Sequence, residues 1–153
     1  MATTTASITL NSADILSNAI SLSKTSTLYH GGTTATGLTQ FKSGKVNVYV
    51  TGASFDLIPA LASEEASATN SYVYIVNKDT TAANYVNISI YNEVIGRLYA
   101  GDWMFIPWEQ NDPVGDNGSD NDIEIEALVG GPQPVEWMVF TESTATILDA
   151  SGD

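Results

Sequence analysis

The sequence predicts an all-β protein: an antiparallel β-sandwich or jelly-roll-like domain that follows an extended N-terminal arm. Three observations support this fold class. Short runs rich in β-branched and aromatic residues recur from residue 46 onward, separated by turn-forming residues. Several runs alternate apolar and polar residues, which is typical of strands with one buried and one solvated face. The sequence indicates no amphipathic helix of normal length.

Residues 1–45 differ in composition from the rest of the chain. They are rich in Thr, Ser, Ala and Gly and contain short, widely spaced apolar pieces. An exposed Ile/Leu series needs a partner that covers it, so we interpret this region as an extended arm that docks on a neighbouring subunit. A loosely ordered tail is the alternative. The docking side chains would be Ile8, Leu10, Ile15, Leu16, Ile20 and Leu22.

Strands are expected in order along a sandwich domain of residues 46–142, and residues 143–153 are expected to form a tail. The expected strands are Val46–Val50, Phe55–Ile58, Ser71–Asn77, Asn84–Tyr91, the two arms of Glu93–Trp108, Ile123–Val129 and Val135–Thr141. The linker at residues 78–83 fits a hairpin with a longer loop between the third and fourth of these strands. Strands at this spacing are typical of a sandwich or barrel.

The stretch Glu93–Trp108 carries the strongest local pattern. It reads EVIGRLYAGDWMFIPW, with apolar residues on both sides of a tight Ala100-Gly101-Asp102 turn. This pattern predicts a β-hairpin with two aromatic-rich arms. Four aromatic side chains are expected to fill the core or an oligomer interface: Trp103, Phe105, Trp108 and Trp137.

Charge narrows the range of partners. Eighteen Asp and Glu against five Lys and Arg give a formal charge of −13, and the five cations are scattered. Nucleic acid is not expected as a partner, because binding a phosphate backbone needs clustered cations. Anionic membrane surfaces are disfavoured for the same reason. The chain has no cysteine, no leader-like N-terminus and no apolar run of membrane-spanning length, so we expect synthesis in a cytosol.

The loop at residues 111–122 is the best metal candidate. Asp112, Asp116, Asp120 and Asp122 crowd it, and Ca²⁺ binds where carboxylates converge. The residues fit no EF-hand register, and Asn117-Gly118 indicates a solvated turn instead. No cofactor and no other metal site are expected.

Other reactive side chains have simpler interpretations, and no catalytic residue is expected. His30 lies beside two glycines without a nucleophile-elbow pattern, which favours a turn histidine. Glu124 and Glu126 are two positions apart and face the same side of a strand. They could be the carboxylate pair of a glycosidase, but a solvated strand face explains them more simply. The tryptophans and tyrosines could stack on sugars, but in a two-sided sheet most should be core or interface.

The turn at Gly101-Asp102 is similar to the Gly-Asp-x-x-x-x-Pro step of cupin-type jelly rolls, with Pro107 closing it. Metal-binding cupins follow this step with histidines and a carboxylate. No histidine follows here, and a transition metal would lose its preferred ligands. The similarity therefore supports the architecture and argues against cupin enzymology.

A wider resemblance connects the chain to structural proteins of tailed bacteriophages, notably those of marine and cyanobacterial hosts. The pieces that carry it are Ser7-Ile8-Thr9-Leu10 with Asp14-Ile15, Gly37-Leu38, Tyr74-Ile75-Val76-Asn77, Ile95 to Trp108, and Glu136-Trp137-Met138-Val139-Phe140. The most specific of these is the Gly-Arg-Leu…Gly-Asp…Ile-Pro-Trp segment. The acidic loop is longer than this resemblance leads us to expect.

The resemblance implies a virion structural protein without a catalytic role, on the capsid exterior after assembly in the host cytoplasm. A capsid decoration (cement) protein is favoured, because such proteins tend to be small β domains, often trimeric, with arms that spread over capsomers. The expected partners are the major capsid protein and further copies of the chain, as a homotrimer or another homo-oligomer. Two alternatives stay open: a tail-fibre or baseplate module that binds host glycans, and a cupin-like enzyme or small-molecule binder.

Overall fold

The computed structural model describes residues 4–13, 20–29, 37–38, 40–60, 71–109 and 121–141. The chain divides into two compact units, Met1–Thr39 and Gln40–Asp153. The expected boundary was residue 45, and the difference arises because residues 40–45 already belong to a strand of the second unit. The all-β class is confirmed, since every regular element in the described residues is a strand. The described part of the chain contains no helix that could span a membrane.

The first unit is a two-stranded antiparallel hairpin. Strands β1 (Thr4–Ser12) and β2 (Ile20–Leu28) pair along their full lengths, with Leu10 opposite Leu22. We expected an extended arm, and this part of it pairs with itself. Ile15 and Leu16, two of the expected docking residues, lie outside the described residues.

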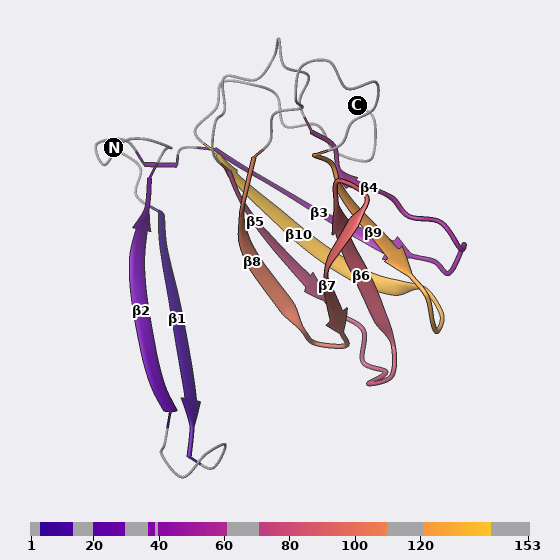
Figure 1. Ribbon diagram of the computed structural model, residues 1–153, viewed down its shortest axis with the longest axis horizontal. Coiled ribbons are helices and arrows are strands. Elements are labelled where there is room, and N and C mark those ends of the chain that lie inside the picture. Colours follow the sequence, from indigo (N-terminus) through magenta and orange to yellow (C-terminus); the bar gives the residue numbers. More distant parts are fainter. Residues whose placement is uncertain are drawn as a thin grey trace. The chain divides into compact units, whose positions relative to one another are not determined.

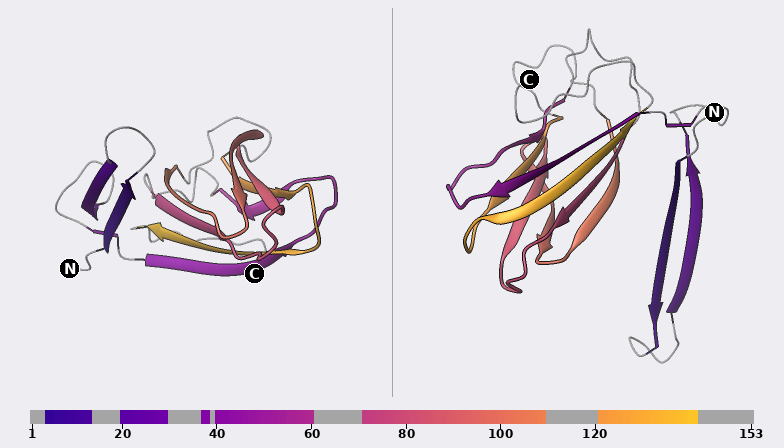
Figure 2. Two further views of the ribbon diagram at one scale, coloured as in Figure 1. Left: turned by 90° about the horizontal axis from the view of Figure 1, so that it is seen from below. Right: turned by 180° about the vertical axis from the view of Figure 1, so that it is seen from behind.

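The second unit is a sandwich of two four-stranded antiparallel sheets (Figure 1). The first sheet has the order β3-β10-β5-β8 and the second the order β4-β9-β6-β7. The strands are β3 (Gln40–Val48), β4 (Phe55–Ile58), β5 (Ser71–Asn77), β6 (Tyr85–Ile90), β7 (Glu93–Tyr99), β8 (Trp103–Trp108), β9 (Ile123–Ala127) and β10 (Gln133–Thr141). Figure 2 shows the sandwich from two further directions.

Pairing in the sandwich is nested. β3 pairs with β10, β4 with β9, β5 with β8 and β6 with β7, and these pairs fall alternately in the first and second sheet. Strands β3 to β6 and strands β7 to β10 are thus the two arms of one long hairpin, and β6–β7 is its tip. Both arms cross between the two sheets together, so that successive pairs alternate between the sheets. Additional pairing of β10 with β5 and of β9 with β6 joins these strand pairs into two four-stranded sheets.

The prediction that Glu93–Trp108 forms a β-hairpin is wrong, because its two arms, β7 and β8, lie in opposite sheets and do not pair. The turn at its centre is real: Gly101 has a φ of +85°, and Asp102 Oδ2 accepts a hydrogen bond from Tyr99 N at 3.0 Å. The N–H of Gly101 donates to the carbonyl of Asn77 on β5, which directs the chain toward the first sheet. The expected hairpin across residues 78–83 is wrong for the same reason, since β5 and β6 also lie in different sheets.

A hairpin that the sequence pattern did not reveal joins β6 and β7. Its two-residue loop is Tyr91-Asn92, and both residues have a φ of 58°. Positive φ at both central residues is the requirement of a type I′ turn, whose twist matches that of the flanking strands. The register shifts after Ile88, so that one extra residue of β7 forms a bulge.

The core lies between the two sheets. Its fully buried members include Val73 and Ile75 of the first sheet and Ile88, Ile123 and Ile125 of the second. Burial of such side chains contributes about 1.5–3 kcal/mol each relative to exposure.

Two tryptophans complete this core. Trp108 and Trp137 are both buried, and the indole N–H of Trp108 donates to the carbonyl of Asn121 at 2.8 Å. Trp137 lies directly over Gly44, where any added Cβ would approach the indole ring to 2.6 Å. The glycine on β3 therefore makes room for the tryptophan on β10.

Candidate binding surfaces

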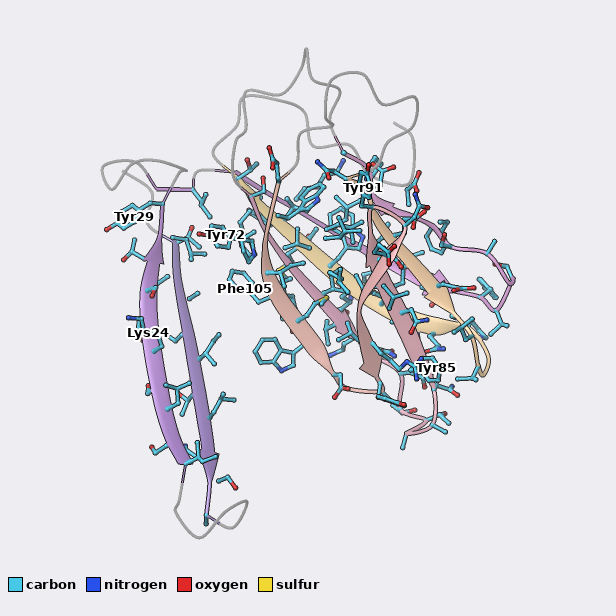
Figure 3. The ribbon with its side chains drawn as sticks, in the orientation of Figure 1. Lys24, Tyr29, Tyr72, Tyr85, Tyr91 and Phe105 are labelled. Atoms are coloured by element: carbon cyan, nitrogen blue, oxygen red, sulfur yellow. The ribbon has the colours of Figure 1, made fainter. Side chains whose placement is uncertain are left out.

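The hairpin of the first unit has two chemically different faces. Because side chains alternate along paired strands, Ile8 and Leu10 of β1 share one face with Ile20 and Leu22 of β2. All four are exposed, from 39% for Ile8 to 55% for Leu10. Lys24 lies opposite Ile8 on the same face and is labelled in Figure 3. Four of the six expected docking residues are thus brought together.

The other face of the hairpin consists of hydroxyl and amide side chains. Ser7 and Thr25 are joined across the strands at 2.9 Å, Thr9 and Ser23 at 3.4 Å, and Ser21 donates to Asn11 at 3.0 Å. Cross-strand contacts of this kind stabilise a sheet modestly and keep its face hydrated. The hairpin is therefore amphipathic, and its apolar face is exposed among the described residues of the first unit.

The two units also differ in charge. Residues 1–39 contain one acid, Asp14, and one base, Lys24, so their formal charge is zero. The whole excess of −13 lies in residues 40–153. An acidic partner surface would therefore repel the sandwich but not the hairpin.

The outer face of the first sheet is apolar and aromatic. Strand alternation turns nine apolar residues outward on its four strands: Phe41, Tyr72, Tyr74, Val76, Trp103, Phe105, Pro107, Met138 and Phe140. The same phase carries Ser43, Lys45, Asn47, Pro134 and Glu136. We call this outer surface the aromatic face. Tyr72 stacks on Phe105 with ring centroids 5.6 Å apart and planes 8° from parallel, and Figure 3 labels both. Phe105 also meets Phe140 edge-on, and Tyr74 contacts Trp103.

Charge is almost absent from the strand residues of the aromatic face. Lys45 and Glu136 are its charged side chains, and they form an ion pair with 2.7 Å between Nζ and Oε1. The hydrogen bond from Lys45 holds the pKa of Glu136 below its ordinary value. The two charges cancel, so the face is neutral within a strongly acidic unit.

The outer face of the second sheet mixes charged and polar side chains with apolar ones, among them Val94 and Tyr99 of β7, which are 58% and 42% exposed. Glu124 and Glu126 of β9 lie there beside Ser89 and Asn87 of β6. Arg97 of β7 donates through Nε to Asn87 at 3.2 Å, and its guanidinium covers the ring of Tyr85 with 4.1 Å to the centroid. The sandwich therefore has one outer face dominated by aromatic side chains and one of mixed character that carries acids such as Glu126.

The four aromatic residues expected in the core or an interface separate into two pairs. Trp108 and Trp137 are buried between the sheets, whereas Trp103 is 53% exposed and Phe105 half-buried on the aromatic face. The tyrosines of that face, Tyr72 and Tyr74, were also expected in the core or an interface, whereas Phe41 and Phe140 were not named. A signal was present, because β5, β8 and β10 carry large apolar residues in both phases of the alternation.

The described residues give the Ca²⁺ candidate no support. Asp122 is buried, and its carboxylate accepts a hydrogen bond from the backbone N–H of Ala60 at 2.5 Å, which is a structural role. Its three loop companions Asp112, Asp116 and Asp120 lie outside the described residues, as does His30. Within the described ranges, no group of three or more His, Cys, Asp or Glu side chains could hold a metal ion.

Comparison with protein-family models, curated proteins and solved structures finds no match for this chain. The molecule is thus defined by its own architecture: an antiparallel β-sandwich with an aromatic outer face and an amphipathic hairpin in a separate unit.

Proposed function

We propose that the chain is a structural virion protein of a tailed bacteriophage that binds and stabilises the capsid surface. In this role it has no catalytic function: the hairpin docks on the major capsid protein, and the sandwich associates with further copies. The resemblance of its sequence segments to phage structural proteins supports the class. The amphipathic hairpin is the observation that carries the docking role.

The hairpin supports this role because its apolar face needs a cover. A two-stranded sheet is marginally stable in water unless its apolar side packs against something. Ile8, Leu10, Ile20 and Leu22 form a row that a groove on a partner protein could bury. Each leucine buried there would contribute about 1.5–3 kcal/mol, and several arms of one oligomer would bind cumulatively.

The strand topology of the sandwich is compatible with a capsid protein. We infer that the nested pairing is a jelly roll, an architecture used by viral capsid domains and also by lectins and cupins. Because one fold serves many functions, the proposal depends on the surfaces of the molecule.

Particle imaging tests the location. In a density map of purified phage particles, the sandwich should lie on the capsid exterior in contact with major capsid protein. Absence of the chain from the particles would overturn the proposal.

A binding assay tests the hairpin. Leu10→Thr with Leu22→Thr keeps strand propensity but removes the centre of the apolar row. Co-sedimentation with capsids assembled without this chain should weaken at least tenfold. The control, Thr9→Val with Ser23→Val, alters the opposite face of the hairpin and should leave capsid binding unchanged. Equal loss in both variants would refute docking through the apolar face.

The aromatic face favours a second candidate, a tail-fibre or baseplate module that binds host glycans. Tyr74 and Trp103 lie side by side on it, and open aromatic rings can stack on sugars. Reproducible binding on a glycan array, with or without Ca²⁺, together with a position on the tail, would favour this candidate over capsid decoration.

A further inference from the structure

We infer that the aromatic face packs against the same face of a second copy of this chain, around a two-fold axis. The inference takes from the proposed function only the idea that copies associate, and it names the surface and the symmetry. It does not depend on the hairpin or on any capsid.

The first argument is the size and chemistry of the exposed apolar area. Phe41 is 69% exposed, Trp103 53% and Met138 37%, and they come from three different strands of one sheet. Contiguous apolar patches across a whole sheet are unusual on monomeric proteins and mark interaction sites. Aromatic and Met side chains are also the residues enriched at protein interfaces.

The second argument is electrostatic and points to a copy of the chain as the occupant. Two copies carry −13 each, so they repel one another unless a specific interface overcomes that repulsion. On the outer face of the second sheet, for example, Glu124 and Glu126 would meet their own copies. The charged strand residues of the aromatic face are the mutually paired Lys45 and Glu136, so two such faces meet without net repulsion.

The third argument is geometric. Stacked sheets pack face to face at about 10 Å, and interdigitating side chains fill the space between them. Tyr72 and Phe105 are already packed against each other, with ring centroids 5.6 Å apart, so this part of the face is ordered before a second copy meets it. A face that meets its own copy obeys two-fold symmetry, which gives a dimer at this surface in place of the trimer that the resemblance implies.

Sedimentation equilibrium of the full chain tests the inference. The expected mass is twice the 16.2 kDa of one chain. Association should strengthen between about 0.05 M and about 0.5 M NaCl, because salt screens the repulsion between two acidic sandwiches while the apolar contact remains. A monomer at both salt concentrations, or a trimer, would overturn the inference.

A matched pair of variants assigns the surface. Trp103→Glu places two carboxylates in the interface of a two-fold dimer and should weaken dimerisation at least tenfold. Val94→Glu makes the same change in charge at a side chain that is 58% exposed on the second sheet, and should leave the dimer intact. Equal weakening by both variants would show that net charge, not the aromatic face, controls association.

Two further variants keep the result interpretable. Phe41→Glu, at the most exposed ring of the face, should weaken the dimer without affecting folding, and circular dichroism of each variant checks the fold. The hairpin variant Leu10→Thr with Leu22→Thr should dimerise as the unmodified chain does. Loss of the dimer in that variant would assign self-association to the hairpin and refute the inference, whereas loss of capsid binding alone would not.

Discussion

Removing one buried amide should destabilise the sandwich strongly. Gln133 of β10 is fully buried, and its side chain makes three hydrogen bonds. Nε2 donates to the carbonyls of Tyr85 at 2.9 Å and Val129 at 2.8 Å, and Oε1 accepts from Asn77 Nδ2 at 3.1 Å. Asn77 in turn donates to the carbonyl of Leu98 at 3.1 Å. The two amides thus tie β5 and β10 of one sheet to β6 and β7 of the other.

The cost of Gln133→Leu follows from the groups that lose a partner. One buried N–H of Asn77 would lose its partner, as would the part-buried carbonyl of Tyr85, and a buried group left without a partner costs about 1–3 kcal/mol. The carbonyl of Val129 belongs to a residue that is 36% exposed, so water can replace its partner. Leucine also adds apolar burial, and we therefore expect a loss of about 2–4 kcal/mol in the free energy of unfolding.

Urea unfolding at fixed protein concentration measures this loss. The midpoint should fall while the m-value is unchanged, because the same surface is exposed on unfolding. Glu93→Leu is a polar-to-leucine control at an exposed position of β7, outside the aromatic face, and it should stay within about 0.5 kcal/mol of the unmodified chain. In a double-mutant cycle, Asn77→Leu and Gln133→Leu should be non-additive because they share a bond. A Gln133→Leu variant as stable as the unmodified chain would refute the reasoning.

Three further predictions concern local packing, a turn and acid stability. Gly44→Val should cost about 1–3 kcal/mol, because its side chain must displace the Trp137 indole; chemical denaturation tests this, and an unchanged midpoint would contradict the close contact. Asn92→Val should cost about 1–2 kcal/mol at a φ of 58°, whereas Asn92→Gly should be close to neutral; thermal unfolding of both separates backbone strain from loss of a side chain. The pKa of Asp79 is lowered from 3.8, first by the backbone N–H of Thr81 and then by the Asn84 amide. A lowered folded-state pKa means that Asp79 stabilises the fold above pH 3.8 and that this contribution is lost as the pH falls through the lowered value. Asp79→Asn should therefore flatten the pH dependence of stability in that acid range, and an unchanged acid transition would refute the assignment.

The strands were predictable because their signal is local. Runs such as Ser71–Asn77 combine β-branched and aromatic residues, and the expected bounds of this run match β5. Pairing was less predictable, because short linkers suggest hairpins whether or not the chain crosses between sheets. At Gly101 the deciding contact is the hydrogen bond to the carbonyl of Asn77, a residue 24 positions earlier in the chain.

The candidate surfaces were predictable in part. The apolar residues Ile8, Leu10, Ile20 and Leu22 stand out in a Ser/Thr-rich segment, and we expected them to dock. Their gathering on one face required the pairing of β1 with β2 in a particular register. A shift of that register by one residue would have turned one strand's apolar side chains to the opposite face.

The sequence by itself determined the all-β class, the position of most strands and the apolar character of the N-terminal segment, because these depend on composition and on a period of two. The tertiary structure alone decided which rings became core and which became surface. In β5 both phases of the alternation are apolar, so local pattern cannot distinguish the face of Val73 and Ile75 from that of Tyr72 and Tyr74. The second sheet covers only one side of β5, and the opposite phase was left outward as the aromatic face.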